Sequence, residues 1–345
     1  MTTTGKMGKF ALKAFLACGL TVLATAYANH DASARTLKWT SFSSAKHPSH
    51  AAANIPFQKE VEEKSGGSLK VDFFLNGSLG KAADQLQIIE SGVADIGVII
   101  PNYTKGRFPL AELAELPFAF DSAEEATAAF QGILKDYIEK EFTSVKLLSL
   151  GVTAPLQVMT TKQPIKKVED LDGLRLRGSD GARVLEKFGA SIVLISSADT
   201  YLALDRSTLD GTTVPLGSMF NYKLEEVIKY ANMLNLYEVA LPLVMNLDTW
   251  NGLSPEEQKI VSAAAQNFAH NTALSQDNST NEGRAKATKA GVEIIDMTAE
   301  TRKKLQEAAK PFWDQTIAGL NEKGLPGDQI LKQLIAARDA YRSSH

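Results

Sequence analysis

The regular alternation of strand and helix patterns between residues 37 and 205 constrains the fold of this chain more than any other feature. Short apolar runs alternate with longer segments of helical periodicity, and glycine or proline ends many of them. The predicted strands span Leu37–Phe42, Leu69–Leu75, Asp95–Ile100, Lys146–Leu150, Leu156–Thr161 and Ser191–Leu194. The predicted helices span His50–Ser65, Ala82–Ser91, Glu124–Phe142, Ala182–Phe188 and Ser197–Asp205. This order predicts an α/β fold in which helices cover the sheets.

A long helix is predicted in the last third of the chain. The segment Ser254–Glu257 supplies an N-cap serine, a proline at the first helical position and the glutamate of a capping box. No strong breaker follows before Gly283, and a helix reaching the Ala290 region would be about 55 Å long. We expect a helix of that length to run along two domains. Thr298 caps a further helix, which we expect Pro311 to break or kink.

Residues 1–28 have the pattern of a secretory signal peptide. Three lysines precede the apolar run Ala14–Ala28, which is too short to span a bilayer. Ala26–Ala28 is a small-x-small cleavage site, and Ala32–Ala34 is a second candidate that would move cleavage to residue 34. A buried N-terminal helix is the alternative. No other stretch is apolar enough to cross a membrane, so we expect a soluble protein exported to the periplasm.

The mature chain is expected to contain no cysteine, because Cys18 lies inside the apolar run. A disulfide, a thiolate nucleophile and a cysteine-based metal site are then excluded, and stability must come from the hydrophobic core. Roughly 310 residues are enough for such a core and indicate two domains. Removal of three lysines with the signal changes the formal net charge from −3 to −6. That sign argues against nucleic acid or an anionic membrane as the main partner.

Two arginines alternate with leucines in the short predicted strand Leu174–Arg177. Leu174 and Leu176 share one face of this strand, and Arg175 and Arg177 share the other. Arg177 lies at the carboxyl end, where open α/β sheets bind their ligands, and its planar guanidinium matches a carboxylate. Taken alone, these residues favour the alternative of two solvated surface arginines.

Familiar catalytic and metal-binding signatures are absent from the sequence. It contains no Gly-x-Ser-x-Gly elbow, no Gly-x-Gly-x-x-Gly loop and no His-Glu-x-x-His pair. His47 and His50 have a spacing that suits a metal on a helix, but Pro48 separates them and no acidic cluster accompanies them. We interpret them as a loop leading into a helix cap. We predict no metal, no cofactor and no catalytic residue.

Three further stretches are candidates for a pocket wall, although core packing is the favoured interpretation of each taken alone. Ile99–Tyr103 follows a buried strand, and Asp210–Pro215 combines a turn with a short strand. Leu243–Asn246 is an apolar strand that carries one amide, with Trp250 beyond it.

Together these stretches resemble the periplasmic solute receptors of tripartite ATP-independent periplasmic (TRAP) transporters, a family first described for C4-dicarboxylates. The resemblance covers nearly the whole mature chain, and its motifs keep their order and spacing over about two hundred residues. The motifs are His47-Pro48, Ser65–Leu69, Gly77–Gly80, Gly92–Asp95, Leu116–Phe118, Asp172–Arg177, Leu209–Gly211, and Trp250 before Leu253-Ser254.

The resemblance implies a two-lobed, periplasmic-binding-protein-like (type II) fold with a long helix crossing both lobes. It places residues 35–154 and 243–282 in lobe I, and residues 155–242 and 283–345 in lobe II. It implies capture of a small organic acid in a closing cleft and delivery to a TRAP membrane permease, and we expect a monomer. The carboxylate-binding arginine of the family falls on Arg177, whereas Arg175 is expected to be structural.

The chain departs from the family pattern at two positions. Gln157 stands where many members carry a second arginine, and Val214 stands where many carry an asparagine. A second buried carboxylate would then lack a counter-charge, so we predict a monocarboxylate with an apolar body, such as an aromatic or keto acid. The predicted ligand-binding residues are Arg177, Gln157, Met159, Ile100, Tyr103, Val214, Phe220, Asn246 and Trp39.

Three alternatives remain open from the sequence. The first is a C4-dicarboxylate receptor of the same family. The second is an exported enzyme that handles a carboxylate, which the missing nucleophile–base and metal constellations oppose. The third is a sensory binding module, which would require a partner other than a permease.

Overall fold

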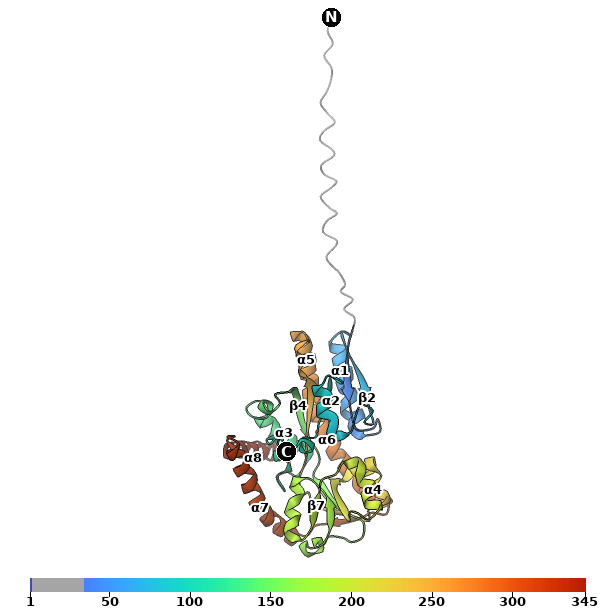
Figure 1. Ribbon diagram of the computed structural model, residues 1–345, viewed down its shortest axis with the longest axis vertical. Helices are drawn as coiled ribbons and strands as arrows, with labels where there is room; N and C mark the ends of the chain where they lie inside the picture. Colours follow the sequence, from blue (N-terminus) through green and yellow to red (C-terminus); the bar gives the residue numbers. More distant parts are fainter. Residues whose placement is uncertain (2–33) are drawn as a thin grey trace. The chain divides into compact units, whose positions relative to one another are not determined.

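Two mixed β-sheets organise residues 35–345 (Figure 1). The strands are β1 (Arg35–Thr40), β2 (Leu69–Phe74), β3 (Ile96–Val98), β4 (Val145–Val152), β5 (Leu156–Thr160), β6 (Arg175–Arg177), β7 (Ser191–Val193), β8 (Gly211–Pro215), β9 (Tyr230–Met233), β10 (Ala240–Asn246) and β11 (Glu293–Asp296). The first sheet has the order β2-β1-β3-β10-β4, and the second has the order β11-β9-β5-β8-β6-β7. This computed structural model describes Met1 and residues 34–345, so the predicted signal sequence lies outside the described residues apart from Met1.

Helices connect these strands, as the α/β prediction requires. They are α1 (Ile55–Lys64), α2 (Gln85–Glu90), α3 (Ala123–Ile133), α4 (Thr200–Asp205), α5 (Leu247–Asn251), α6 (Pro255–Lys289), α7 (Ala299–Glu322) and α8 (Gly327–Ser344). In the part of the chain that the structure describes, no helix is both long and apolar enough to cross a membrane.

Helix α6 confirms the prediction of one long helix after Ser254. The Ser254 hydroxyl accepts a hydrogen bond from Glu257 N at 3.3 Å, and the Glu257 carboxylate accepts one from Ser254 N at 2.9 Å. The helix packs on α1, α3 and β4 beside the first sheet, and on β11 and the 3₁₀ helix Leu216–Tyr222 beside the second. A Cβ at Gly217 would lie 2.6 Å from the Ser279 carbonyl oxygen, so glycine permits this close approach. Helix α6 therefore connects the two halves of the protein, the first half built on the first sheet and the second half built on the second sheet.

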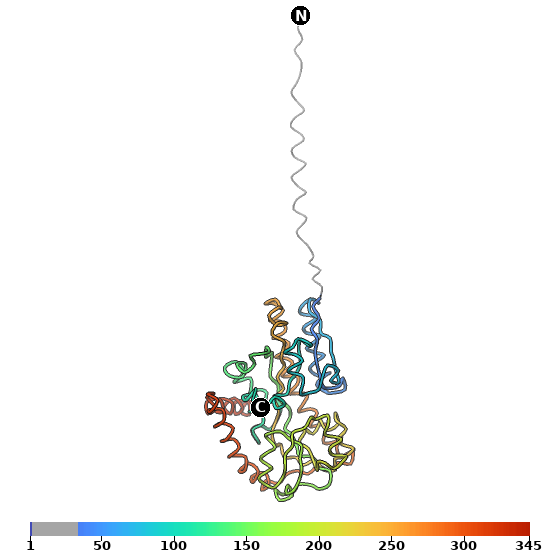
Figure 2. The backbone as a smooth tube through the Cα atoms, viewed as in Figure 1, coloured from blue at the N-terminus to red at the C-terminus, as the bar shows by residue number. Residues whose placement is uncertain are grey.

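Two short segments, residues 153–155 and 234–239, carry the chain between the sheets (Figure 2). They are hydrogen-bonded to each other and to the start of β5. Thr153 N donates to Val239 O at 2.9 Å, Leu156 N donates to Tyr237 O at 2.7 Å, and Leu236 N donates to Leu156 O at 2.9 Å. Adjacent crossings of a few residues are the arrangement from which hinges between lobes are built.

Some predicted helices differ from the structure. The single helix predicted to reach Phe142 is wrong, because α3 ends at Ile133 and a separate 3₁₀ helix (Ile138–Glu141) follows. The Glu141 carboxylate accepts hydrogen bonds from Leu110 N and Ala111 N. These bonds hold the 3₁₀ helix against residues 110 and 111, which lie about thirty residues earlier in the chain. Pro311 does not break α7, which continues to Glu322, and the alternative prediction of a kink at Pro311 stays a prediction.

The C-terminal helix α8 packs against α3 beside the first sheet, although residues 283–345 are predicted to belong to lobe II. Ile330 and Leu334 of α8 share a buried core with Phe130 of α3 and Leu147 of β4. Burial of these apolar side chains, rather than sequence order, decides where α8 lies. The other lobe boundaries stay a prediction.

Candidate ligand-binding site

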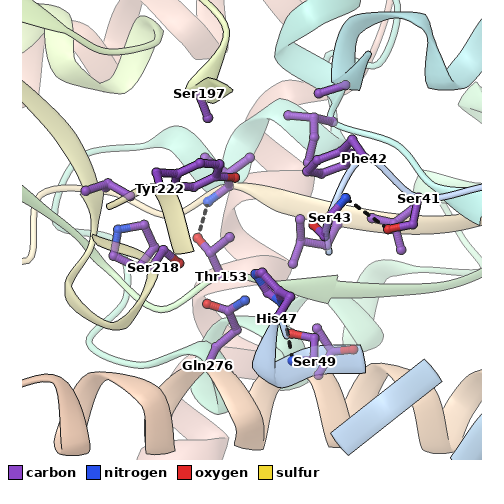
Figure 3. Close-up of a pocket in the computed structure, with 18 of the residues that line it drawn as sticks. Ser41, Phe42, Ser43, His47, Ser49, Thr153, Ser197, Ser218, Tyr222 and Gln276 are labelled. Carbon is purple, nitrogen blue, oxygen red and sulfur yellow. Dashed lines mark hydrogen bonds between the residues drawn. The ribbon is translucent and has the colours of Figure 1, made fainter. Parts of the chain in front are cut away.

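A cavity of about 160 Å³ lies between the two sheets. Its wall combines the end of β1 and the loop after it with residues of β6 and β8, the two crossing segments and one face of α6. Figure 3 shows side chains from these elements, including Phe42, Thr153 and Gln276, together with Tyr222 of the 3₁₀ helix Leu216–Tyr222. A cavity of roughly 150 Å³ in another protein binds benzene, so this one suits a ligand with a body of that size.

Arg177 reaches the cavity from the carboxyl end of β6, as the sequence predicts. Its guanidinium is held by Ile195 O at 3.2 Å through Nε and by Thr213 O at 3.1 Å through Nη1. Its Nη2 donates to Ser197 Oγ at 3.0 Å and lies 3.4 Å from the Tyr103 hydroxyl. These four partners are neutral, and none of the ion pairs found within residues 34–345 involves Arg177. A half-buried cation positioned in this way attracts an anionic ligand.

Arg175 has a different environment at the other end of the same short strand. It is exposed and lies outside the cavity wall. Its Nε and Nη2 donate to the two carboxylate oxygens of Asp210 at 2.9 and 3.0 Å. A further hydrogen bond from Nη2 reaches Ser207 O at 2.8 Å. Arg175 thus pairs within the protein, which agrees with the structural role expected for it.

The structure brings five of the nine predicted binding residues together in the cavity wall. They are Arg177, Trp39, Ile100, Tyr103 and Val214. The Tyr103 hydroxyl also accepts a hydrogen bond from Ser197 N at 3.3 Å, so it helps to fix the loop that holds the guanidinium.

Gln157 and Met159 lie outside the cavity wall, contrary to the predicted site geometry. Gln157 is fully buried and its amide faces the crossing segment, where Nε2 donates to Asn235 Oδ1 at 2.6 Å and Oε1 accepts from Asn235 N at 2.9 Å. These bonds hold Asn235 in the left-handed region, with φ of 46°. Met159 packs in the core of the second half. Gln157 and Met159 belong to β5, and Leu156 at the start of that strand lines the cavity instead.

Phe220 and Asn246 also lie away from the cavity wall. Phe220 packs on the same core as Met159. Asn246 caps α5, where its Oδ1 accepts from Thr249 N at 2.9 Å, and its Nδ2 donates to Ile89 O at 2.8 Å. Both of its polar atoms are occupied by the fold, which corrects its predicted position in the site.

Several residues that line the cavity are not among the predicted ligand-binding residues. They include Phe42, His47, Phe268, Thr272, Gln276 and Tyr222. For the α6 residues a signal exists, because positions 268, 272 and 276 recur every four residues and so share one face of a helix. Phe42 and His47 lie in a loop and Tyr222 ends the 3₁₀ helix Leu216–Tyr222, and the sequence pattern does not specify the course of either segment.

His47 lines the cavity as a neutral side chain. Its Nδ1 accepts a hydrogen bond from Ser49 N at 3.3 Å, which leaves the proton of the neutral ring on Nε2. Burial, and to a lesser extent the neighbouring His50, lowers the pKa of His47 to about 4. The loop leads into a helical segment, as predicted, but this segment begins with a π-helical turn (His50–Asn54) that no side chain caps. No cluster of three potential metal ligands occurs among the described residues.

The lowered pKa of His47 predicts a specific pH dependence of stability. The unfolded chain binds the histidine proton more tightly, because its pKa there is near 6.5. The stability that His47 contributes is therefore complete above pH 6.5 and is lost as the pH falls towards 4. Urea denaturation should show wild-type stability falling more steeply than that of His47→Gln across this window, with parallel curves above it. Equal slopes for the two proteins would contradict the buried neutral state.

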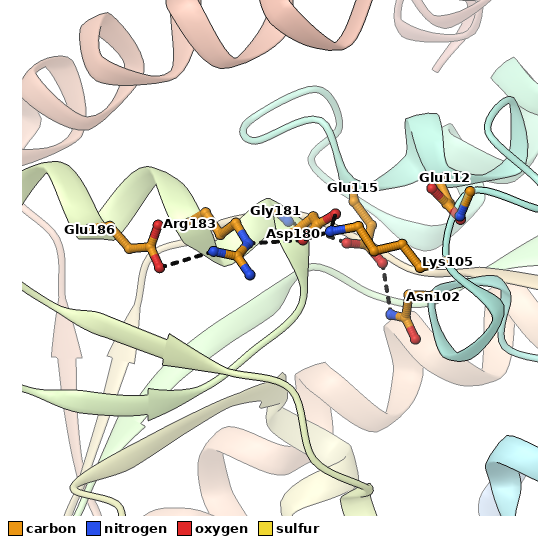
Figure 4. Close-up of polar contacts among 9 residues, drawn as sticks. Asn102, Lys105, Glu112, Glu115, Asp180, Gly181, Arg183 and Glu186 are labelled. Atoms are coloured by element: carbon orange, nitrogen blue, oxygen red, sulfur yellow. Dashed lines mark hydrogen bonds and ion pairs between the residues drawn. The ribbon is translucent and has the colours of Figure 1, made fainter. Parts of the chain in front are cut away.

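Polar contacts join the two halves beside the cavity (Figure 4). Asn102 Nδ2 donates to the Glu115 carboxylate at 2.7 Å, and Gly181 N, from the second half, donates to it at 3.2 Å. Lys105 Nζ lies 2.8 Å from the Asp180 carboxylate across the same boundary. Burial raises the pKa of Glu115. A Cβ at Gly181 would lie 2.5 Å from Glu115 O, so the two halves meet closely here.

Two sheets joined by a double crossing, with a cation-lined cavity between them, define a two-lobed solute receptor. Residues 40–319 match the model of the family described as bacterial extracellular solute-binding protein, family 7. The chain belongs to this family, which confirms the resemblance to TRAP solute receptors and the two-lobed α/β fold.

Solved structures and characterised relatives agree with this assignment. A TRAP solute-binding protein of Rhodoferax ferrireducens, in complex with copurified benzoate, is 26% identical with a TM-score of 0.85, covering 90% of this chain and 99% of that one. A marine metagenome TRAP protein specific for aromatic acid ligands is 27% identical with a TM-score of 0.83, covering 89% and 99%. The 2,3-diketo-L-gulonate-binding periplasmic protein of Escherichia coli is 25% identical, covering 78% of this chain and 84% of that protein.

Proposed function

We propose that this protein is a periplasmic receptor that binds a small monocarboxylate with an apolar body and delivers it to a TRAP permease. The observation that carries the proposal is Arg177, whose guanidinium is positioned in the cavity by neutral groups and has no anionic partner within residues 34–345. Delivery to a permease is the role of this family, and relatives of this chain are periplasmic proteins.

The composition of the wall favours one carboxylate over two. Among the described residues that line the cavity, Arg177 is the only arginine or lysine. Apolar side chains such as Trp39, Ile100, Val214 and Phe268 contribute much of the remaining wall. A second carboxylate would be buried without a counter-charge, whereas an aromatic or aliphatic body would be stabilised by contact with these groups.

Two relatives bind ligands of this class. The Rhodoferax ferrireducens structure holds benzoate. A relative from Nostoc, 26% identical over 82% of this chain and 78% of that protein, is a monocarboxylate 2-oxoacid-binding periplasmic protein. Both ligand types carry one carboxylate on a small body and would fit a cavity of about 160 Å³.

Ligand capture would follow from movement about the crossing segments. In an open form the acid would meet Arg177 in a hydrated cleft. Closure would exclude water and strengthen the ion pair, since a charge interaction grows as the local dielectric constant falls. The contacts of Glu115 and Lys105 with the second half would then stabilise the closed form. Binding without turnover and a monomeric state are part of this proposal.

A thermal-shift panel tests the ligand class. We expect benzoate and a small 2-oxo monocarboxylate, at about one hundred times their dissociation constants, to raise the melting temperature by about 5 °C. Benzamide, which keeps the ring and lacks the charge, should have little effect. Stabilisation by succinate and malate alone would contradict the proposal and favour the dicarboxylate alternative.

A further inference from the structure

The boundary between the two halves falls within the second crossing segment, residues 234–239. Tyr237 packs in the core of the second half, and its hydroxyl accepts a hydrogen bond from Ser179 N at 3.2 Å. The next residue is held by the first half, because Glu238 N donates to Ala114 O at 3.2 Å, and Ala114 lies in the core of that half. A rotation of one half against the other would therefore act on the backbone around Glu238.

The carboxyl group of Glu238 is buried without a partner. The residue is 0% exposed, and neither of its carboxyl oxygens has a hydrogen-bond partner among the described residues. Its neighbours Tyr237 and Val239 line the cavity, whereas Glu238 does not. An ionised carboxylate costs far more to bury without a partner than a neutral carboxyl group does, so burial favours the protonated form.

The charges around Glu238 act in the same direction. Asp121 and Glu125 lie beside the start of α3, and Asp277 lies on α6, which packs against α3. Burial first, and then repulsion from these three carboxylates, raises the pKa of Glu238 well above its ordinary value. The position in the crossing segment and the acidic surroundings thus both bear on one carboxyl group.

Neighbouring groups on α8 do not supply a counter-charge to Glu238. Arg342 pairs with Asp121 and with Glu125, each at 2.7 Å. Tyr341 lies beside the same acids, and burial together with the charges of these acids raises the pKa of its hydroxyl, which keeps it neutral. Within residues 34–345, no ion pair involves Glu238.

The other charged groups on the neighbouring elements also have partners of their own. Arg338 of α8 pairs with Asp339 at 2.7 Å. On the 3₁₀ helix that carries Ala114, the Glu112 carboxylate accepts a hydrogen bond from a backbone N–H at 3.0 Å. Glu115 of the same helix is bonded across the boundary beside the cavity. These contacts leave the proton as the group that neutralises Glu238.

We propose that Glu238 is a proton-linked switch in the hinge, which carries a proton in the closed form and releases it to water when the receptor opens. Opening would turn the backbone that holds Glu238 and admit water to its carboxyl group, which favours ionisation. Closure on the ligand would then take up a proton, so the receptor would bind its acid more tightly at lower pH. This inference rests on the proposed function, because it assumes closure about the crossing segments when a monocarboxylate binds.

Calorimetry in buffers of different ionisation enthalpy measures the protons taken up when benzoate binds to the mature protein. The pH range lies above the one in which His47 changes its charge. Wild type should take up a fraction of a proton at about pH 7.5, and its dissociation constant should rise about fivefold from about pH 6.5 to about pH 8.5. Glu238→Gln keeps the shape of the neutral acid and cannot ionise, so it should take up less than half as much and keep a constant affinity.

Glu141→Gln is the matched control for this experiment. Burial raises the pKa of Glu141 to about 8, so this carboxyl group also titrates in the chosen range. It lies outside the crossing segments and is bonded to backbone groups of the first half, so closure should not change its proton affinity. The control variant should therefore show the proton uptake of wild type.

The outcomes separate this inference from the proposed function. Equal proton uptake by wild type and Glu238→Gln would overturn the switch but leave the monocarboxylate receptor intact. Binding of benzoate to wild type without any proton uptake would do the same, whether or not the variant folds. If no monocarboxylate binds wild type, the proposed function fails and this inference fails with it. Melting temperatures of the unliganded variants show whether each has folded.

Discussion

Replacing Trp39 with alanine is expected to lower the free energy of unfolding by about 3–5 kcal/mol. Only 1% of Trp39 is exposed, and its ring centroid lies 5.2 Å from Phe57, 5.6 Å from Phe73 and 5.4 Å from Phe268. The substitution would leave a cavity among these rings and remove apolar burial between β1, α1 and α6. Because Phe268 also lines the binding cavity, the loss should weaken ligand binding as well. Chemical denaturation followed by circular dichroism measures the change.

Trp250→Ala is the matched control for this prediction. Trp250 is only half-buried, and its ring lies under the Lys146 ammonium group at 5.6 Å. An exposed cation–π contact contributes about 0.5–1 kcal/mol, so the control should lose much less stability than Trp39→Ala. Equal losses for the two variants would show that the cluster around Trp39 does not dominate the stability of the first half.

The overall fold could be predicted because local chemistry specifies it. Alternating strand and helix patterns indicate sheets that are covered by helices. The capping box at Ser254 sets the start of α6. The packing of α8 could not be predicted in this way. Its apolar residues, such as Ile330 and Leu334, indicate a buried face without indicating which neighbour buries it.

Strands β6 and β5 show why one predicted residue lines the cavity and two others do not. Arg177 is placed by the end of β6, which a glycine marks in the sequence. Strand β5 is buried along its whole length, so it lacks the polar–apolar alternation that would identify its inward face. A shift of one position exchanges the two faces, and Leu156 lines the cavity while Gln157 and Met159 do not.

The residues missed by sequence reasoning belong to loops, to α6 and to the 3₁₀ helix Leu216–Tyr222. His47 lies in a loop and Tyr222 ends the 3₁₀ helix, and the course of both segments depends on tertiary contacts. Thr272 and Gln276 have the spacing of one helix face, but so have several other residues of α6. Only the position of the second sheet shows which face of the helix lines the cavity.

Replacing Arg177 with alanine is expected to raise the dissociation constant for a bound monocarboxylate by roughly a hundredfold to several thousandfold. Loss of one partner of a buried ion pair costs about 3–5 kcal/mol, because the other charge is left desolvated and unpaired. The unliganded protein should remain folded, since Arg177 is only half-buried and forms no ion pair within residues 34–345. Arg177→Lys keeps the charge but loses the planar fork, so its affinity should be intermediate.

Calorimetric titration of benzoate into Arg177→Ala and Arg175→Ala tests the central claim most directly. The two arginines lie on one short strand, but Arg175 is paired with Asp210 outside the cavity. We predict that Arg177→Ala loses measurable binding, whereas Arg175→Ala binds within about threefold of wild type, since an exposed pair contributes less than about 1 kcal/mol. An unchanged dissociation constant for Arg177→Ala would contradict the assignment of Arg177 as the partner of the ligand carboxylate.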